Sequence, residues 1–139
     1  SNSKKHYNQY IKGWNLESFY LKWDNNNFID ILRLQDAALI PISKNLFTAC
    51  KTNNRVVQAV MNDVEVITDS IQSYEEFSKF CFIDSWEEGL KEVIRSKKDT
   101  RKKLLRLEGM RNIIKSKYSI DIISKKWSDF FQDSLNKKI

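Results

Sequence analysis

The sequence predicts an α/β fold, in the form of a Rossmann-like three-layer domain with a short parallel sheet and a helical C-terminal third. A continuous apolar run at residues 37–42 is typical of a strand buried on both faces, and residues 64–68 show a second strand pattern. A helical pattern over residues 55–61 separates the two, and helical patterns dominate residues 85–135. Strand–helix alternation followed by covering helices favours a parallel sheet, so we expect residues 1–139 to form a single domain.

The N-terminal segment contains three short predicted elements. Residues 4–12 carry tyrosine and isoleucine at helical spacing and predict a helix that ends near Gly13. Residues 16–23 alternate in a way that suits a strand and are rich in aromatic side chains. Residues 24–27 then supply cap residues for a helix whose apolar side chains recur at helical spacing over residues 28–35.

The following segment should build the sheet. Pro41 lacks an N–H group, so we expect it at the end of the first strand. Residues 43–54 are polar and predict a loop that leads into the helix at residues 55–61. After the second strand, we expect a short helix at residues 74–79 and a minor strand at residues 80–83.

The C-terminal third is predicted to be helical. Ser85 and Glu88 have the spacing of a capping box and should open one helix. Asp99 is expected to cap a long helix that ends near residue 118, and a terminal helix follows over residues 120–135. Its apolar and aromatic side chains should face inward: Ile122, Ile123, Trp127, Phe130 and Phe131.

The composition excludes several kinds of active site. The chain has 139 residues with one histidine, His6, which argues against a histidine-based triad or a histidine-rich metal site. Its three glycines are scattered, so a Walker loop and a dinucleotide-binding glycine motif are both absent from the sequence. Cys50 and Cys81 lie far apart and do not form a CxxC motif. We expect a reduced, cytosolic chain without a signal peptide or a membrane-spanning segment.

The positive charge is unevenly distributed. Residues 1–70 contain 8 basic and 7 acidic residues, whereas residues 71–139 contain 16 basic and 11 acidic residues and so carry +5 of the total +6. The excess is concentrated in residues 95–117, and a basic stretch of this kind suggests a polyanion or an anionic membrane surface as a partner. A solvated helix face is the simpler interpretation of the same residues. Nucleic acid is an unlikely partner because this stretch lacks interleaved aromatic residues.

The most informative polar residues lie around the start of the helix at residues 55–61. Ligands of parallel sheets bind at the carboxyl ends of the strands, which favours the loops after Pro41 and after Thr68. A helix that starts at this edge attracts phosphate through its free N–H groups and its dipole. Lys51 and Arg55 add positive charge, and residues 52–54 add hydrogen-bonding side chains. An ordinary helix cap also explains residues 52–54, and the motif chemistry taken alone favours that interpretation.

The order of these segments resembles the C-terminal domain of GT-B glycosyltransferases. The resemblance rests on DAALIPI at 36–42, NRVVQAVM at 54–61 and VEVITD at 64–69, followed by SYEEF at 73–77 and WEEGL at 86–90. The stretch from Arg111 to Tyr118, with Trp127 and Leu135 after it, is similar to the closing helices of that family. The similarity covers roughly residues 16–135 in the same order, and the collinear series carries it more than any single motif.

The resemblance implies a site for a nucleotide-diphospho-sugar donor. By matching position, the residues that would hold the donor diphosphate are Thr52, Asn53, Asn54 and Arg55. Gln58 would contact the donor ribose at a position where the family has glutamate, and an amide accepts a weaker hydrogen bond than a carboxylate. The further candidate donor contacts are Lys51, Ser73 and Tyr74. The family generally uses basic residues and helix dipoles on the leaving diphosphate, so no metal ion or other cofactor is implied.

The family resemblance also defines what this chain lacks. A GT-B enzyme has two Rossmann-like domains, so the resemblance implies that residues 1–139 are a fragment of the donor domain, without the N-terminal acceptor domain. We expect the chain alone to be inactive, although the whole enzyme would transfer a sugar to an acceptor hydroxyl, with polysaccharide biosynthesis in the cytoplasm or at the inner face of the membrane as the setting. A family glutamate near Cys50 is absent, and Asp63-Val64-Glu65 replaces a Gly-x-Pro turn. A non-catalytic binding or assembly module on the same scaffold is the alternative.

Overall fold

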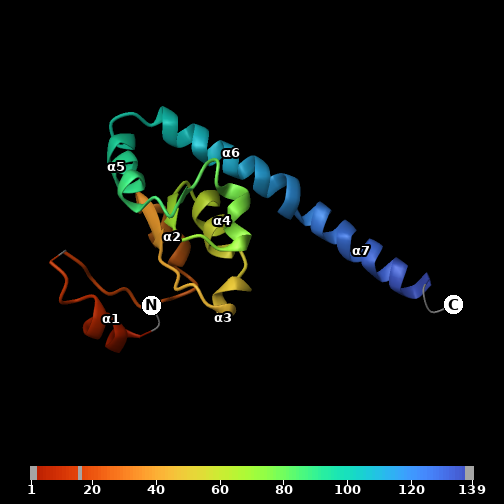
Figure 1. Ribbon diagram of the computed structural model, residues 1–139, viewed down its shortest axis with the longest axis horizontal. Coiled ribbons are helices and arrows are strands. Elements are labelled where there is room, and N and C mark those ends of the chain that lie inside the picture. The colour runs from red at the N-terminus through yellow and green to blue at the C-terminus, as the bar shows by residue number, and fades with distance from the viewer. Residues whose placement is uncertain (1–2, 16, 137–139) are drawn as a thin grey trace. The chain divides into compact units, whose positions relative to one another are not determined.

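The computed structural model describes residues 3–15 and 17–136, which belong to two compact units: residues 1–34 and residues 35–139 (Figure 1). The first unit contains two short helices, α1 (Lys4–Tyr10) and α2 (Phe28–Arg33). The second contains the sheet and all the remaining helices.

The first unit is mostly irregular chain between its two helices. The Ser3 side chain caps α1 by accepting a hydrogen bond from the backbone N–H of His6. The strand predicted at residues 16–23 is wrong over residues 17–23, which are neither strand nor helix, and Leu16 lies outside the described residues. An alternating pattern makes a strand only when another strand pairs with it, and no described strand does so here. The Tyr7 hydroxyl donates to the Ser18 carbonyl at 2.7 Å instead.

The second unit is built on a three-stranded sheet in which every pair is parallel. Its order is β1 (Ala37–Ile40), β2 (Glu65–Thr68) and β3 (Phe82–Ile83), and Ala38 pairs with Val66 while Ile67 pairs with Phe82. All four residues of β2 are buried, because this central strand has a neighbour on each side and helices over it. The two predicted sheet strands and the minor third strand are therefore confirmed, and the fold is mixed α/β with a helical C-terminal part.

Two helical connections join the strands. The chain passes from β1 to β2 through α3 (Leu46–Ala49) and α4 (Asn54–Met61), and from β2 to β3 through the 3₁₀ helix η1 (Gln72–Phe77). The prediction of an uninterrupted loop over residues 43–54 missed α3, which is only four residues long and is held by a capping box between Asn45 and Thr48. Helix α4 packs its buried face against β1 and β2 with Val56, Ala59 and Val60.

Helix α5 (Trp86–Ser96) lies against β2 and β3 through a glycine. A Cβ atom at Gly89 would come within 3.0 Å of the Ile67 and Phe82 side chains, so the absence of a side chain lets the helix approach the sheet. The capping box predicted from Ser85 is wrong. No side chain caps this helix, because the Ser85 hydroxyl donates to the Ile83 carbonyl at 3.1 Å.

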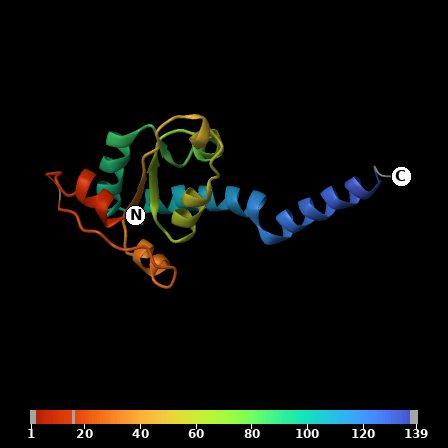
Figure 2. The same ribbon diagram turned by 90° about the horizontal axis from the view of Figure 1, so that it is seen from below.

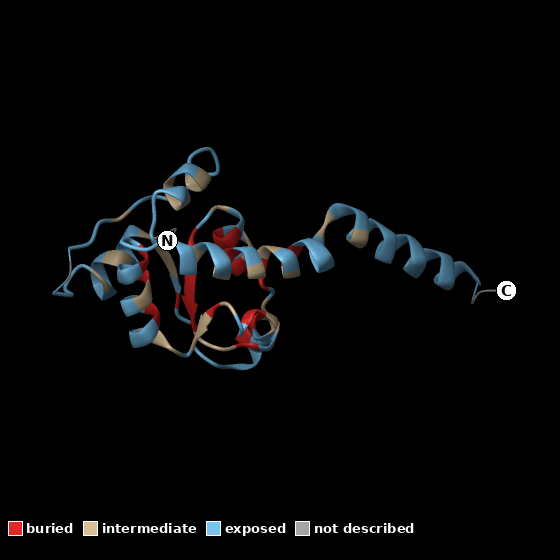
Figure 3. Ribbon diagram, turned by 90° about the horizontal axis from the view of Figure 1, so that it is seen from above, coloured by how far each residue is buried: buried red, intermediate tan, exposed pale blue. Residues whose placement is uncertain are grey.

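Helix α6 (Arg101–Tyr118) covers the unit with three buried residues, Leu107, Met110 and Ile114. Most of the helix is exposed or only partly buried (Figure 3). It contacts α4, α5 and η1. Its N-cap residue is Thr100, not the predicted Asp99, although the Asp99 carboxylate accepts the backbone N–H of Arg101 at 3.0 Å. The position of the helix is thus as predicted, and the cap is one residue displaced.

Helix α7 (Ile120–Asn136) continues from α6 and leads away from the sheet (Figures 1 and 2). The prediction that its aromatic face points inward is wrong, because none of its residues is buried. Trp127 and Phe130 are each 58% exposed and Phe131 is 57% exposed; Ile123 is also exposed and Ile122 is only half-buried. The helical period was correct, but no part of the described chain covers this face. The three aromatic rings contact one another, with Trp127 stacked on Phe131 at 5.7 Å.

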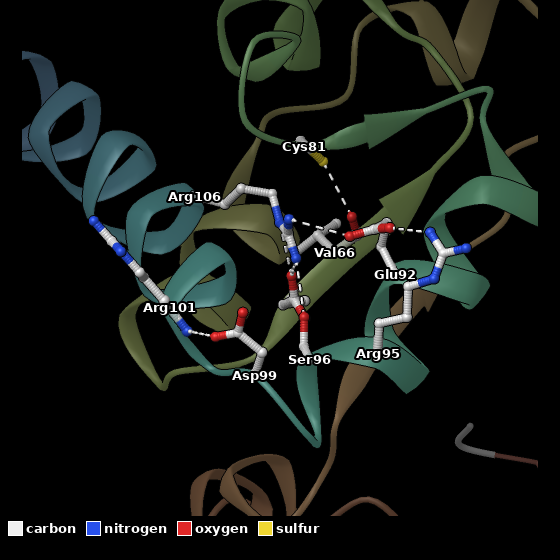
Figure 4. Close-up of polar contacts among 9 residues, drawn as sticks. Val66, Cys81, Glu92, Arg95, Ser96, Asp99, Arg101 and Arg106 are labelled. Carbon is white, nitrogen blue, oxygen red and sulfur yellow. Dashed lines mark hydrogen bonds and ion pairs between the residues drawn. The ribbon is translucent and has the colours of Figure 1, made fainter.

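A buried ion pair connects the sheet to α6 (Figure 4). Arg106 donates two hydrogen bonds to one carboxylate oxygen of Glu65, at 2.9 Å from Nε and 2.5 Å from a terminal nitrogen. The same guanidinium donates to the Ser96 hydroxyl at 3.1 Å and lies 5.0 Å from the Phe82 ring centroid. Arg106 thus fastens α6 to the start of β2, to the end of α5 and to β3. Within the described part of the chain, no helix is long and apolar enough to cross a membrane.

Candidate functional site

The carboxyl edge of the sheet is organised by Asp69, which follows β2 directly. One carboxylate oxygen accepts the backbone N–H of Ile42 at 2.7 Å, and the other accepts the indole N–H of Trp86 at 2.8 Å. These two bonds join the segment after β1 to the first residue of α5. The sequence placed Asp69 at a strand end but could not show that its side chain holds three elements together.

A second carboxylate, that of Asp84, lies at the same edge of the sheet, directly after β3. Asp84, after β3, accepts the backbone N–H of Ser70 at 2.9 Å and lies 3.5 Å from the ammonium group of Lys44. Hydrogen bonding to Ser70, reinforced by the charge of Lys44, holds the pKa of Asp84 below its ordinary value. Its backbone adopts a left-handed conformation with φ of 52°, which aspartate tolerates better than most residues. The loops after all three strands are therefore linked by side chains at one edge.

A cavity of about 190 Å³ opens between α3 and the segment that follows β2. It is lined by residues of both connecting segments: Lys44, Asn45, Thr48, Ala49, Ser70, Ile71 and Gln72. The sequence favoured these two loops as the ligand edge, and the structure places both of them at the carboxyl edge of the sheet. The individual lining residues were missed, and their only signal was their position just after a strand end.

The residues predicted to hold a diphosphate occupy different environments. Thr52, Asn54 and Arg55 are exposed at the start of α4, where no side chain caps the helix. Asn53 is buried, and its amide donates to a carboxylate oxygen of Glu76 at 2.8 Å. Arg55 therefore belongs to the first turn of a helix whose N-terminus no side chain caps, and a helix N-terminus with a nearby basic residue suits an anion.

The residue predicted to contact a ribose shares this exposed surface. Gln58 lies four positions after Asn54 and three after Arg55, so the three side chains occupy one face of α4. None of the three lines the 190 Å³ cavity. The structure thus brings three predicted residues together on α4 and keeps them apart from the cavity at the strand ends.

Of the three remaining predicted contacts, Ser73 and Tyr74 are engaged inside the protein, whereas Lys51 lies over an exposed aromatic ring. The Ser73 hydroxyl donates to the Lys51 carbonyl at 2.7 Å, and the Lys51 ammonium group lies 5.3 Å from the Phe47 ring centroid. Tyr74 is only 1% exposed and is among the most buried side chains. Burial raises the pKa of its hydroxyl above the ordinary value, against the opposing effect of Arg55. Tyr74 is therefore a core residue, and it has little surface to offer a ligand.

Glu76 is a polar junction that the sequence did not reveal. Besides Asn53, its carboxylate accepts the Tyr118 hydroxyl at 2.6 Å and the Lys117 ammonium group at 2.8 Å. Partial burial disfavours the charged form, but the hydrogen bonds from Lys117, Tyr118 and Asn53 outweigh it and lower the pKa of Glu76. The junction fixes the residue before α4 to the last two residues of α6, which lie 41 and 42 positions after Glu76 in the sequence. Local sequence patterns carry no signal for such a contact.

The described residues offer little support for a metal site or for a cysteine nucleophile at Cys81. Over residues 3–15 and 17–136, no three histidine, cysteine or acidic residues come together to hold a metal ion. Cys81 is buried, its thiol donates to the Val66 carbonyl at 3.4 Å (Figure 4), and burial raises its pKa to about 12. That thiol is a poor nucleophile, since the thiolate is the reactive form.

Comparisons of the chain with protein-family models, with curated proteins and with solved structures gave no match.

Proposed function

We propose that the chain is the donor-nucleotide part of a GT-B-type glycosyltransferase, with the layered arrangement of a Rossmann-like domain. The single observation that supports this most is the uncapped N-terminus of α4, which carries Asn54, Arg55 and Gln58 on one exposed face beside a parallel sheet. A nucleotide-diphospho-sugar presents a diphosphate and ribose hydroxyl groups. An uncapped helix N-terminus with a guanidinium suits the first, and an amide one turn later suits the second.

The proposed reaction moves a sugar from the nucleotide diphosphate to an acceptor hydroxyl. Negative charge develops on the leaving diphosphate, so Arg55 and the first N–H groups of α4 would stabilise it by fixed electrostatics. Under this proposal the acceptor would be held by a second, N-terminal domain, and the protein would act in the cytoplasm. No metal ion enters the proposal.

Thermal unfolding in the presence of nucleotides tests the donor site. UDP, GDP and their sugar derivatives are titrated to millimolar concentration, and a ligand that binds the folded chain raises the melting temperature by mass action. Arg55→Gln should abolish most of the shift, because it removes the only charged side chain among the three on this face. Lys12→Gln is the matched control, since Lys12 is exposed, carries the same charge and lies in the first unit.

The variant Gln58→Glu should increase the nucleotide-induced shift in melting temperature. A purely structural role of Gln58 would not produce such an increase. A carboxylate accepts a hydrogen bond from a hydroxyl roughly twice as strongly as a neutral amide does. The variant should therefore enlarge the shift with the cognate nucleotide. A melting temperature that no nucleotide raises, in the original chain and in this variant alike, would leave the donor site without support.

A non-catalytic binding or assembly module on the same scaffold is the second candidate. The observation in its favour is that Asn53 and Ser73 are committed to internal hydrogen bonds and Tyr74 to the core. Three of the eight residues predicted to contact the donor thus make contacts within the protein instead. The absence of any nucleotide-induced shift, in a chain that unfolds cooperatively, would favour this candidate.

A further inference from the structure

The net positive charge of the chain lies entirely beyond the end of α5. Residues 97–139 contain 13 basic and 5 acidic residues, a balance of +8, whereas residues 1–96 contain 11 basic and 13 acidic residues, a balance of −2. The two balances sum to the total of +6. A charge separated in this way creates a local field that attracts an anionic partner to one region of the surface.

The structure separates the ten basic residues of 95–117 into two equal groups. Five are neutralised by carboxylates within the chain: Arg95, Lys97, Arg106, Arg111 and Lys117. The other five have no carboxylate within 4.0 Å among the residues that the structure describes: Lys98, Arg101, Lys102, Lys103 and Lys115. Folding therefore halves the charge that the sequence offers to a partner.

Four of the five free cations are close neighbours at the junction of α5 and α6. We call Lys98, Arg101, Lys102 and Lys103 the basic turn. Lys98, Arg101 and Lys102 are exposed, and Lys103 is partly so. The side chain of Arg101 extends away from the Arg106 network, while its backbone N–H is held by Asp99 (Figure 4). Among the basic residues of 95–117, most of those without a carboxylate within 4.0 Å are thus concentrated at one end of α6.

Aliphatic side chains are exposed beside the basic turn. Leu104 and Leu105, 54% and 59% exposed, follow Arg101 by three and four positions and so lie next to it on the surface of α6. Ile94, near the end of α5, is 65% exposed. Cations with adjacent aliphatic groups match the two layers of a lipid interface, charged headgroups above acyl chains. Residues 87–117 contain no aromatic side chain on which a nucleic-acid base could stack.

We propose that the basic turn docks the protein on an anionic lipid bilayer. Lys98, Arg101 and Lys102 would bind lipid phosphates, and Leu104 and Leu105 would enter the interface between headgroups and acyl chains. Because these residues lie outside the donor site proposed on α4, membrane binding and nucleotide binding can succeed or fail separately.

Co-sedimentation with vesicles tests the docking surface. The protein should pellet with phosphatidylcholine vesicles that contain phosphatidylglycerol and stay in solution with phosphatidylcholine alone. Raising the salt from about 0.1 M to 1 M should release it, because the Debye length falls from roughly 10 Å to 3 Å. Each cation near such a surface contributes about fivefold to binding, so the triple variant Lys98→Gln, Arg101→Gln, Lys102→Gln should bind on the order of a hundredfold more weakly.

A matched triple variant shows whether vesicle binding depends on the basic turn or only on the net charge of the protein. Lys4→Gln, Lys5→Gln and Lys12→Gln remove the same charge from exposed positions of the first unit, and this variant should keep its binding within about fivefold. All six replaced side chains are exposed, so the melting temperature should stay unchanged and confirm that both variants are folded.

A double variant tests for contact with the lipid interface itself. Leu104→Ser with Leu105→Ser should weaken vesicle binding at least about tenfold, because the two apolar side chains no longer enter the membrane. The proposal is overturned if neutral vesicles bind equally well or if the two triple variants lose binding equally. It is also overturned if a DNA duplex binds more tightly than the anionic vesicles and is indifferent to the leucine variant, which would assign the surface to nucleic acid.

Discussion

Replacing Arg106 with methionine should destabilise the protein strongly. Methionine keeps the unbranched stem and the helix propensity of arginine, so the change isolates the guanidinium. Glu65 is only 3% exposed, and both of its hydrogen bonds from Arg106 end on a single oxygen. Its other oxygen already has no hydrogen-bond partner in the described part of the chain. Removing one member of a buried pair typically lowers the free energy of unfolding by about 3–5 kcal/mol, because the remaining charge cannot reach water.

Urea denaturation followed by circular dichroism measures this loss. With an m-value of roughly 1–3 kcal/mol/M for a small protein, the midpoint of Arg106→Met should fall by about 2 M. The control is Lys91→Met, which breaks an exposed pair with Glu87 and should cost only about 0.3–0.5 kcal/mol.

The double variant Glu65→Leu, Arg106→Met shows why Arg106→Met is unstable. It distinguishes the cost of an unpaired buried carboxylate at Glu65 from the loss of packing contacts at Arg106. An apolar pair of similar volume often restores the stability of a buried ion pair, so the double variant should be more stable than Arg106→Met alone. The reasoning is refuted if Arg106→Met costs no more than Lys91→Met, or if the double variant loses the sum of its two single changes.

Three further outcomes follow from packing and charge. Gly109→Ala should lower the free energy of unfolding by about 1–3 kcal/mol despite the better helix propensity of alanine, because the new Cβ would lie 2.5–2.6 Å from the Phe80 ring; an unchanged urea midpoint would contradict this. Trp127→Ala should change that free energy by less than about 1 kcal/mol, whereas Leu107→Ala, at a position 1% exposed, should cost about 2–5 kcal/mol; equal losses would mean that α7 is covered in solution. Glu76 has a lowered pKa, so its charged form adds stability that is fully present above the ordinary value of 4.5 and is lost as the pH falls through the lower folded value. Urea midpoints measured across pH should therefore show Glu76→Gln less stable at neutral pH and equal to the original chain in acid, and a constant difference would count against the hydrogen-bonded carboxylate.

Local patterns predicted most of the elements of the second unit. The apolar run ending at Pro41 and the pattern at residues 64–68 became the parallel pair β1 and β2, because strand propensity and burial agree there with the global fold. Residues 17–23 had a strand pattern of similar strength and remained irregular. The difference is the availability of a partner strand, which a local pattern does not encode.

The same distinction applies to the candidate site. The pattern around Asn54, Arg55 and Gln58 predicted a helix start with three exposed polar side chains, and the structure has them on one face of α4. It did not predict that Asn53, the adjacent residue, would turn inward to Glu76. Adjacent residues at a helix terminus point in different directions, so Asn53 is buried while Asn54 is exposed. The hydrogen-bond partner of Asn53, Glu76, lies 23 positions further along the chain.

The sequence by itself determined the order of the elements, the parallel pair of strands, the helical period of the C-terminal third and the concentration of positive charge there. Only the tertiary structure decided which of those cations stay free, that Tyr74 belongs to the core, and that the aromatic face of α7 is uncovered. Periodicity and capping depend on neighbours within a few residues, and a sequence displays these directly. Burial and ion pairing depend on contacts such as Glu65 with Arg106, 41 positions apart, which exist only once the chain has folded.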